Sequence, residues 1–455
     1  MSASATALRG YTPPDTGRMR WFVCFLLFLA TTINYMDRSV LSLIEPQLHN
    51  LPFMGWNPHA DNLHQPVFNT NYKHIVQCFQ LAYAIGLLTA GRLIDKLGTK
   101  LGYAIAIGVW ALSSMSHAFV VSVAGFCVAR FMLGIGEAGN FPAAIKAISE
   151  WFPSEERGLA TGLFNSGSNV SYFIAPALIV WATGHFGWQA GFLATGSMGL
   201  LWLVGWLLFP YDRLQRAHRP DNATLTQANL APVLTAGLSG RAFYRQLLRK
   251  PGLYAFSIAK FLTDPIWYFY LFYLPKFLHE TYNLDLKHAY WQIVCVYVVS
   301  SFGSILGGGL SGWRMKGGSS IDAGRKFALL IMALLVVPIV SVPTLGHLFP
   351  TNAWPAVLVI SVAAAAHQGW SANLFSTPPD MFPSRSVSTV TGIGGAMGAL
   401  GGVLFTGLVG SYFSLHPLLI FGIASCAYLV ALGIFQLIVP RLGPPSEAEI
   451  PLSTP

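Results

Sequence analysis

An aspartate and an arginine stand side by side within a long apolar segment near the beginning of the chain. Asp37 and Arg38 lie about two-thirds of the way along a run from Trp21 to near Leu48, which is long enough to cross a bilayer. Each of these charges costs on the order of 2.5–3.5 kcal/mol in hydrocarbon, so such residues usually face a water-filled cavity and have a function there. Because adjacent helical residues point about 100° apart, Arg38 can face an anion while Asp37 faces a neighbouring helix.

This pair predicts an anion site beside a proton site. A guanidinium binds a carboxylate bidentately, and a desolvated carboxyl group close to an arginine can take up and release a proton. Binding of an anion together with a proton would leave the cavity neutral. A structural ion pair that satisfies other polar groups of a helix bundle is the alternative.

A second acid–base pair occurs in a later apolar run. Arg130 and Glu137 are two helical turns apart and therefore share one face, and Gly134 and Gly136 between them permit close packing against another helix. We expect Glu137 to share proton coupling with Asp37, and Arg130 to set the protonation of Glu137 or to latch the outer side. A fixed ion pair within the membrane is the alternative.

Two further groups of polar residues lie in apolar runs of the second half. Lys260 and Asp264 are at positions i and i+4, hence on one face, and Pro265 predicts a kink or break. The lysine could contact a bound anion, or the two residues could form an internal pair. The other group predicts a sugar site, because sugar hydroxyls need hydrogen-bond partners and a sugar ring can lie on a tryptophan; hydrogen bonding between helices is the alternative. This group consists of His367, Gln368, Trp370 and Asn373.

The composition requires that a membrane hold these residues in place. The 455 residues are 53% hydrophobic and only 10% charged, whereas soluble proteins carry about 25% charged residues. The net charge of +9 comes from short loops between apolar runs rather than from one patch, which is typical of the cytoplasmic side of membrane proteins and not of nucleic-acid binding. The five cysteines form neither a disulfide framework nor a metal motif, and we expect no cofactor, no metal and no cleaved signal peptide.

Twelve apolar runs are long enough to be membrane spans. Arg18 and Arg20 place the N-terminus inside, and an even number of spans returns the C-terminus to the same side. The expected spans are 21–48, 72–96, 101–119, 122–149, 157–183, 188–209, 252–282, 289–313, 325–343, 354–376, 384–412 and 416–440. We therefore expect an all-α protein of the inner cell membrane with cytoplasmic tails at 1–20 and 441–455, six-helix bundles at 21–210 and 251–440, and a basic cytoplasmic linker at 211–250.

A weak internal repeat predicts that the two bundles are related. Residues 91–100 (GRLIDKLGTK) follow the second span, and residues 309–318 (GLSGWRMKGG) follow the eighth, which is the matching position. We expect Asp95 in the first copy to cap or pair across helix ends, whereas the second copy lacks an acidic residue. Repeats of this kind are typical of secondary transporters with a central site between their halves.

Several stretches resemble a known family. The loop 91–100 resembles the signature loop of the major facilitator superfamily. Residues 34–38 (NYMDR) resemble the first-helix motif of its anion:cation symporter branch, and residues 130–142 (RFMLGIGEAGNFP) resemble the fourth-helix motif of that branch. Residues 260–270 and 367–373 are similar to bacterial hexuronate transporters, which import glucuronate and galacturonate.

The resemblance implies a twelve-helix carrier of two pseudo-symmetric halves that works by alternating access. It implies proton coupling at Asp37 and Glu137, and it matches Tyr35, Tyr83 and Asn169 to positions that contact the sugar acid. We therefore expect a monomeric proton symporter for a hexuronate, with the lipid bilayer, protons and a small anion as its partners. The alternatives are a carrier of another sugar acid or organic anion, such as an aldonate or glucarate, and an uncoupled facilitator; no nucleophile–base constellation supports an enzyme.

Overall fold

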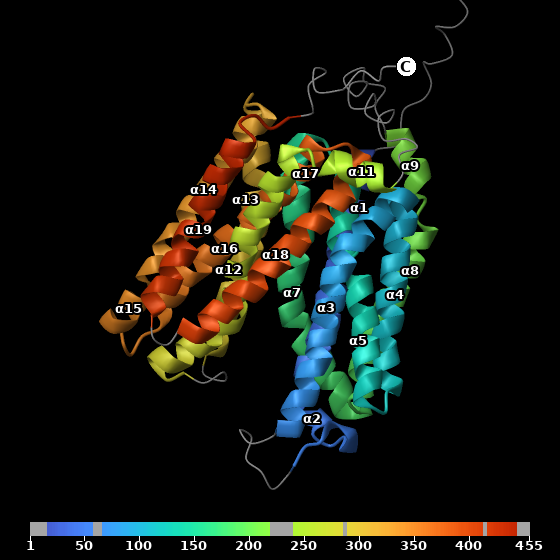
Figure 1. Cartoon of the computed structure of the whole chain (residues 1–455), viewed down its shortest axis with the longest axis vertical. Coiled ribbons are helices and arrows are strands. Elements are labelled where there is room, and N and C mark those ends of the chain that lie inside the picture. The colour runs from blue at the N-terminus through green and yellow to red at the C-terminus, as the bar shows by residue number, and fades with distance from the viewer. Residues whose placement is uncertain (1–15, 58–65, 219–239, 285–288, 413–415, 444–455) are drawn as a thin grey trace, which may run out of the picture.

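Helices make up the regular structure of the protein, and no strand occurs among the residues that the computed structural model describes (Figure 1). The described residues are 16–57, 66–218, 240–284, 289–412 and 416–443. In hydrocarbon every backbone N–H and C=O must be satisfied within the protein, and a helix achieves this within a single segment. An apolar chain of this length therefore folds into a bundle of helices.

The first half of the chain contains the expected six spans. In order they are α1 (Thr16–Leu43), α3 (Pro66–Leu97), α4 (Thr99–Ser116), α5 (Val123–Glu137) with α6 (Asn140–Trp151), α7 (Ser154–Phe186) and α8 (Gln189–Leu208). Short pieces lie between α1 and α3 and after α4, namely α2 (Glu45–Leu48), η1 (Pro52–Met54) and η2 (His117–Phe119).

The second half repeats this arrangement after the linker. The linker contributes α9 (Tyr211–His218) and α11 (Gly240–Leu247), and residues 219–239 of it lie outside the described part. The spans are α12 (Pro251–Tyr282), α13 (Tyr290–Lys316), α14 (Ile321–Val336) with η3 (Val337–Ser341) and α15 (Val342–Leu348), α16 (Trp354–Phe375) with α17 (Thr377–Met381), α18 (Ser384–Tyr412) and α19 (Pro417–Ile438).

The outer surface of this bundle is apolar, as a lipid-facing surface must be. Leucines on four different helices are 60–80% exposed, namely Leu112, Leu201, Leu306 and Leu437. Seven helices within the described residues are long and apolar enough to cross a membrane. The other expected spans, α4, α5 with α6, α7, α12 and α16, fall short of these criteria in length, mean hydropathy or charge. The chain is thus a multi-pass membrane protein.

Three expected features of the spans need correction. The expected span 122–149 is two helices, because the backbone tightens at Gly139, whose N–H donates to the carbonyl of Gly136. The expected span 325–343 is longer and consists of three consecutive pieces that run from Ile321 to Leu348. Conversely, α12 continues through Pro265 without a break, since the other turns of this long helix keep their backbone hydrogen bonds.

The two halves meet at one end of the bundle, which we call the linker end because α9 and α11 lie there (Figure 1). Glycines bring α7 and α13 into backbone contact: a Cβ added to Gly158 would overlap the carbonyl oxygen of Gly308, and one added to Gly162 would overlap that of Ser304. In the same way, α3 meets α18 where Gly392 faces the carbonyl oxygen of Leu87. Small residues at these positions are what allow the helix backbones to approach so closely.

Asp95 fastens the linker end on the side of α3 and α18. Its carboxylate accepts hydrogen bonds from the backbone N–H groups of Ser388 (3.3 Å) and Thr389 (2.8 Å) and from the Thr389 hydroxyl (2.6 Å). It also pairs with Lys146 of its own half at 2.9 Å. Asp95 therefore joins α3 and α6 of the first half to the N-terminal part of α18 in the second half.

Asp380 fastens the other side, where α7 meets the second half. Its carboxylate pairs with Arg325 of its own half at 2.8 Å and with Arg157 of the first half at 2.8 Å. Arg325 also reaches the first half, because it donates to the backbone carbonyl of Ser154 at 2.8 Å. Asp380 of α17 thus supplies the carboxylate on this side, although the second repeat sequence, residues 309–318, contains no acidic residue.

Replacement of Gly158 by valine should prevent the linker end from closing, because the new side chain would overlap the backbone of α13. Overpacking of this kind costs about 1–3 kcal/mol, which corresponds to a shift of roughly 5- to 150-fold between the closed and open states. The shift can be measured as the distance between spin labels on the linker-end tips of α7 and α13.

The matched control is Gly184→Val on the same helix, because no atom lies within 4 Å of a Cβ added there. Its label distances should equal those of the wild type. Equal distances in Gly158→Val would mean that α7 and α13 need not touch.

Candidate functional site

A small cavity of about 90 Å³ lies between the two halves. Side chains from α1, α3, α6 and α7 line it on one side, and side chains from α12, α16 and α18 line it on the other. Its volume is below the roughly 300–1,000 Å³ usual for ligand pockets, so a bound sugar would require the walls to move apart. The polar lining consists of Tyr35, Arg38, Tyr83, Asn165, Ser168, Lys260, Asp264, Tyr268, His367, Gln368, Ser371 and Thr391, with Trp267 among the aromatic residues.

Arg38 supplies the positive charge of the first half. Its Nε donates to Oε2 of Glu137 at 2.6 Å, and its side chain remains 22% exposed to the cavity whereas that of Glu137 is fully buried. The guanidinium carbon lies 4.7 Å from the ring centroid of Tyr35 and 4.5 Å from that of Tyr83. Two aromatic faces therefore hold the guanidinium in place and favour its charge.

Asp37 points away from the cavity, as the helical phase predicts. It is fully buried and accepts a hydrogen bond from the Ser114 hydroxyl at 2.6 Å. Ser114 in turn lies 3.3 Å from the hydroxyl of Thr195. The carboxylate of Asp37 is thus held by α4 and α8, one helix layer behind Arg38.

Glu137 and Arg130 share a buried environment but differ in their partners. The partner that Glu137 contacts directly is Arg38 rather than Arg130, because α5 turns the carboxylate toward α1. Arg130 is buried with its guanidinium carbon 5.8 Å from the ring centroid of Phe192. Its Nε and one terminal nitrogen have no hydrogen-bond partner among the described residues, and the ion pair that Glu137 forms there is with Arg38.

Lys260 and Asp264 form an ion pair on the wall supplied by the second half. The lysine Nζ lies 2.7 Å from Oδ2 of Asp264 and 3.8 Å from the ring centroid of Phe375. Both residues line the cavity. The expected shared face is therefore present, and the pair is internal to α12.

Of the α16 cluster, His367 and Gln368 reach the cavity. The Nδ1 of His367 lies 2.6 Å from the Tyr428 hydroxyl, and its ring stacks on Trp267 with the centroids 5.3 Å apart. Gln368 accepts a hydrogen bond from the Asn165 amide at 2.6 Å, which links the two halves across the cavity. A ligand that entered here would compete with this amide pair.

Three expected contact residues lie outside the cavity lining. Trp370 donates from Nε1 to Thr263 at 3.2 Å, and Asn373 donates to the carbonyls of Gly307 and Gly369 at 2.7 and 2.9 Å. Asn169 is fully buried, and its amide atoms have no hydrogen-bond partner in the described part of the chain. The helical phase turns Trp370 and Asn373 toward neighbouring helices, as the alternative of hydrogen bonding between helices requires.

Several lining residues were not singled out from the sequence. Trp267, Tyr268, Ser168, Ser371, Thr391 and Asn165 join the wall. Trp267 and Tyr268 lie within the stretch 260–270, so the clustering of aromatic residues there was an available signal. Single serines and threonines in a helix give no comparable signal.

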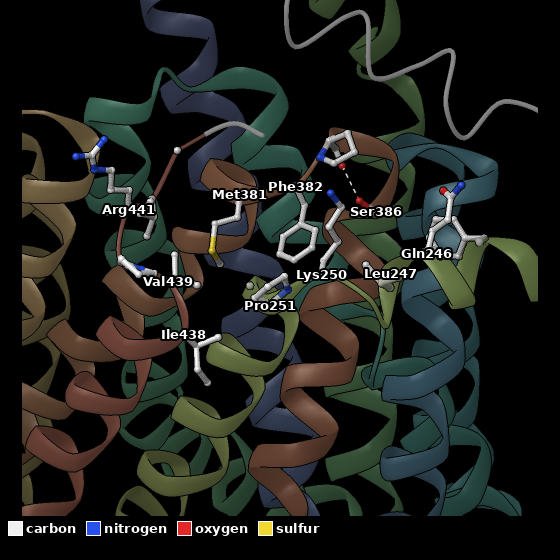
Figure 2. A pocket seen from close by; sticks show the side chains of 16 residues that line it. Gln246, Leu247, Lys250, Pro251, Met381, Phe382, Ser386, Ile438, Val439 and Arg441 are labelled. Carbon is white, nitrogen blue, oxygen red and sulfur yellow. Dashed lines mark hydrogen bonds between the residues drawn. The ribbon is translucent and has the colours of Figure 1, made fainter. Parts of the chain in front are cut away.

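A larger cavity of about 490 Å³ opens at the linker end (Figure 2). It lies between α11, the start of α12, the turn from α17 to α18 and the end of α19, and its walls include Leu247, Met381, Phe382 and Ile438. None of the expected site residues is among its lining in the described structure. The smaller cavity, where the charged and polar groups converge, is therefore the candidate site.

Comparison with known proteins identifies relatives over most of the chain. The sequence profile of the Major Facilitator Superfamily matches residues 27–406. A hexuronate transporter of Escherichia coli K12 is 29% identical over 86% of this chain and 87% of its own length. A galacturonate transporter of Dickeya chrysanthemi is 31% identical over 70% of this chain and 89% of its own length.

A solved structure shares the fold. The proton:xylose symporter XylE, solved with 6-bromo-6-deoxy-D-glucose bound, superposes with a TM-score of 0.73 at 17% identity and covers 94% of this chain and 97% of its own. At this identity the likeness concerns the fold alone. It confirms the expected two bundles of six helices.

Replacement of Arg38 by lysine should weaken binding of labelled glucuronate by at least about tenfold, since an ammonium loses both the bidentate geometry and the stacking between two tyrosines. A scintillation proximity assay on detergent-purified protein measures this binding. Arg20→Lys is the control, because Arg20 forms a partly exposed pair with Glu156 elsewhere. Unchanged affinity in Arg38→Lys would exclude a guanidinium-specific contact.

Proposed function

Because the chain belongs to the major facilitator superfamily, and is therefore a membrane transporter and not an enzyme, we propose that it imports a hexuronate together with protons. The substrate would be glucuronate or galacturonate, and transport would proceed by alternating access of the central cavity to the two sides. The names of the two sugar-acid relatives support this substrate class.

The observation that carries the proposal is the position of Arg38 on the cavity wall. Its guanidinium is stacked between Tyr35 and Tyr83 and is partly exposed, so it can take the carboxylate of a sugar acid bidentately. The facing wall offers Gln368 and Asp264, which can accept hydrogen bonds from sugar hydroxyls. A carboxylate at one end and hydroxyls at the other is the chemistry of a hexuronate.

The Arg38–Glu137 ion pair supports coupling to protons. Arg38 donates to Glu137 from Nε, and a substrate carboxylate would compete for the same cation. Protonation of Glu137 releases Arg38 to the substrate, and the cavity then carries no uncompensated charge when it closes. Asp37, held by Ser114 one layer behind, is the second proton site in this scheme.

The linker end is cytoplasmic in this proposal. The linker, taken as 211–250, carries Arg241, Arg245 and Arg249, which suit anionic lipid headgroups, while Phe243 and Leu247 of α11 are buried against the bundle. Both termini then lie in the cytoplasm of a cell with the protein in its inner membrane. The conformation described here is closed toward the cytoplasm, and one chain is sufficient for transport.

Replacement of Asp37 by asparagine should abolish pH-driven accumulation and retain exchange. Asparagine can still accept the hydrogen bond from Ser114 but cannot bind a proton, so we expect accumulation of labelled glucuronate to fall by at least about tenfold. Proteoliposomes with an imposed pH gradient measure accumulation, and counterflow measures exchange.

Asp322→Asn is the matched control, since Asp322 is a partly exposed partner of Lys326 at the start of α14 and is not among the residues that line the cavity. Wild-type uptake that equilibrates without regard to the pH gradient would favour the uncoupled facilitator. If another organic anion blocks uptake and excess galacturonate does not, the proposed substrate is wrong. The proposed coupling to protons would not be affected by that result.

A further inference from the structure

The Lys260–Asp264 ion pair presents an acceptor rather than a cation to the cavity. The Lys260 side chain is 4% exposed and that of Asp264 is 21% exposed, although Nζ and Oδ2 are only 2.7 Å apart. The ammonium lies behind the carboxylate, against the ring of Phe375. A molecule in the cavity therefore meets the more exposed Asp264 side chain before it meets the ammonium of Lys260.

The backbone of α18 fixes this arrangement from behind. Gly398 lies directly against Asp264, because a Cβ added to this glycine would overlap Oδ2. The i, i+4 spacing on α12 holds the lysine at the distance of an ion pair. Neither charge can turn away from the other without loss of a buried partner, which is strongly unfavourable.

The charges on the lining match a ligand with one carboxylate. Among the described lining residues, Arg38 and Lys260 are cationic and Asp264 is anionic, so these three sum to +1. Asp264 cancels the charge of the lysine of its own helix. Arg38 is then the cation that an anion can approach, once Glu137 is protonated as the proposed function requires and no longer pairs with it. A second carboxylate on the ligand would have to lie near Asp264.

We propose that Asp264 selects sugar acids with one carboxylate and rejects those with two. This inference rests on the proposed function and assigns the substrate class of the same site. Ligand hydroxyls donate hydrogen bonds to the Asp264 carboxylate, whereas a second carboxylate there is repelled and finds Lys260 already paired. Rejection through such a repulsive contact is an effective source of specificity.

Galactonate and galactarate test this proposal, because both are open-chain acids that differ only in a terminal CH₂OH or carboxylate. Each is used to displace labelled galacturonate from purified protein, and the ratio of their half-inhibitory concentrations measures the discrimination. The wild type should favour galactonate by about tenfold or more. Asp264→Asn should lower this ratio by about tenfold, because the repulsion is lost and Lys260 becomes available.

Lys260→Gln changes the charge in the opposite direction and should raise the ratio, because Asp264 is then no longer neutralised. The two variants predict shifts of opposite sign, so the test remains decisive if one of them fails to fold. A ratio that stays within about twofold of the wild type in a folded variant would overturn the inference alone. A wild type that binds none of the three acids would overturn the proposed function and this inference with it.

Discussion

A guanidinium and a carboxylate buried together in a membrane protein constrain everything around them. Arg38 and Glu137 come from different helices, yet their side chains meet at 2.6 Å, and separation without replacement would leave a buried charge at a cost of about 3–5 kcal/mol. The two side chains can separate without this cost if Glu137 is protonated or if another anion takes its place beside Arg38. The rings of Tyr35 and Tyr83, the buried Asp37 and the polar groups on the facing wall surround the place where the proposed exchange would occur.

The fold keeps that exchange away from water at one end. Close backbone contacts at Gly158 and Gly162 exclude solvent between α7 and α13. On the cavity side of these contacts, the Asn165–Gln368 amide pair bridges the two halves. The same bridge lies on the cavity wall, so ligand binding and the contact between the halves depend on shared atoms. In the proposed function, this shared dependence would link ligand binding to the separation of the two halves.

Much of this could be predicted from the sequence, because apolar length and charge placement act locally. The spans and the division into two halves follow from residues near one another in the chain, whereas Asp95 meets Ser388 and Thr389 across 293 and 294 positions. Partners distant in the chain could not be predicted. Asp380 pairs with Arg157 across 223 positions, and no local sequence pattern predicts this ion pair. Helical phase also determines which polar residues of α16 face the cavity. Gln368 faces it, whereas Trp370, two residues later, faces α12.

The two acids at the linker end have a consequence for the speed of the carrier. Asp95 keeps Lys146 and Asp380 keeps Arg325, each within its own half, so neither carboxylate becomes isolated when the halves separate. Opening then breaks hydrogen bonds worth about 0.5–1.5 kcal/mol each, with a larger share from the Arg157 contact, instead of stranding a charge. Contacts of this kind can hold the linker end closed and still be broken at a modest free-energy cost.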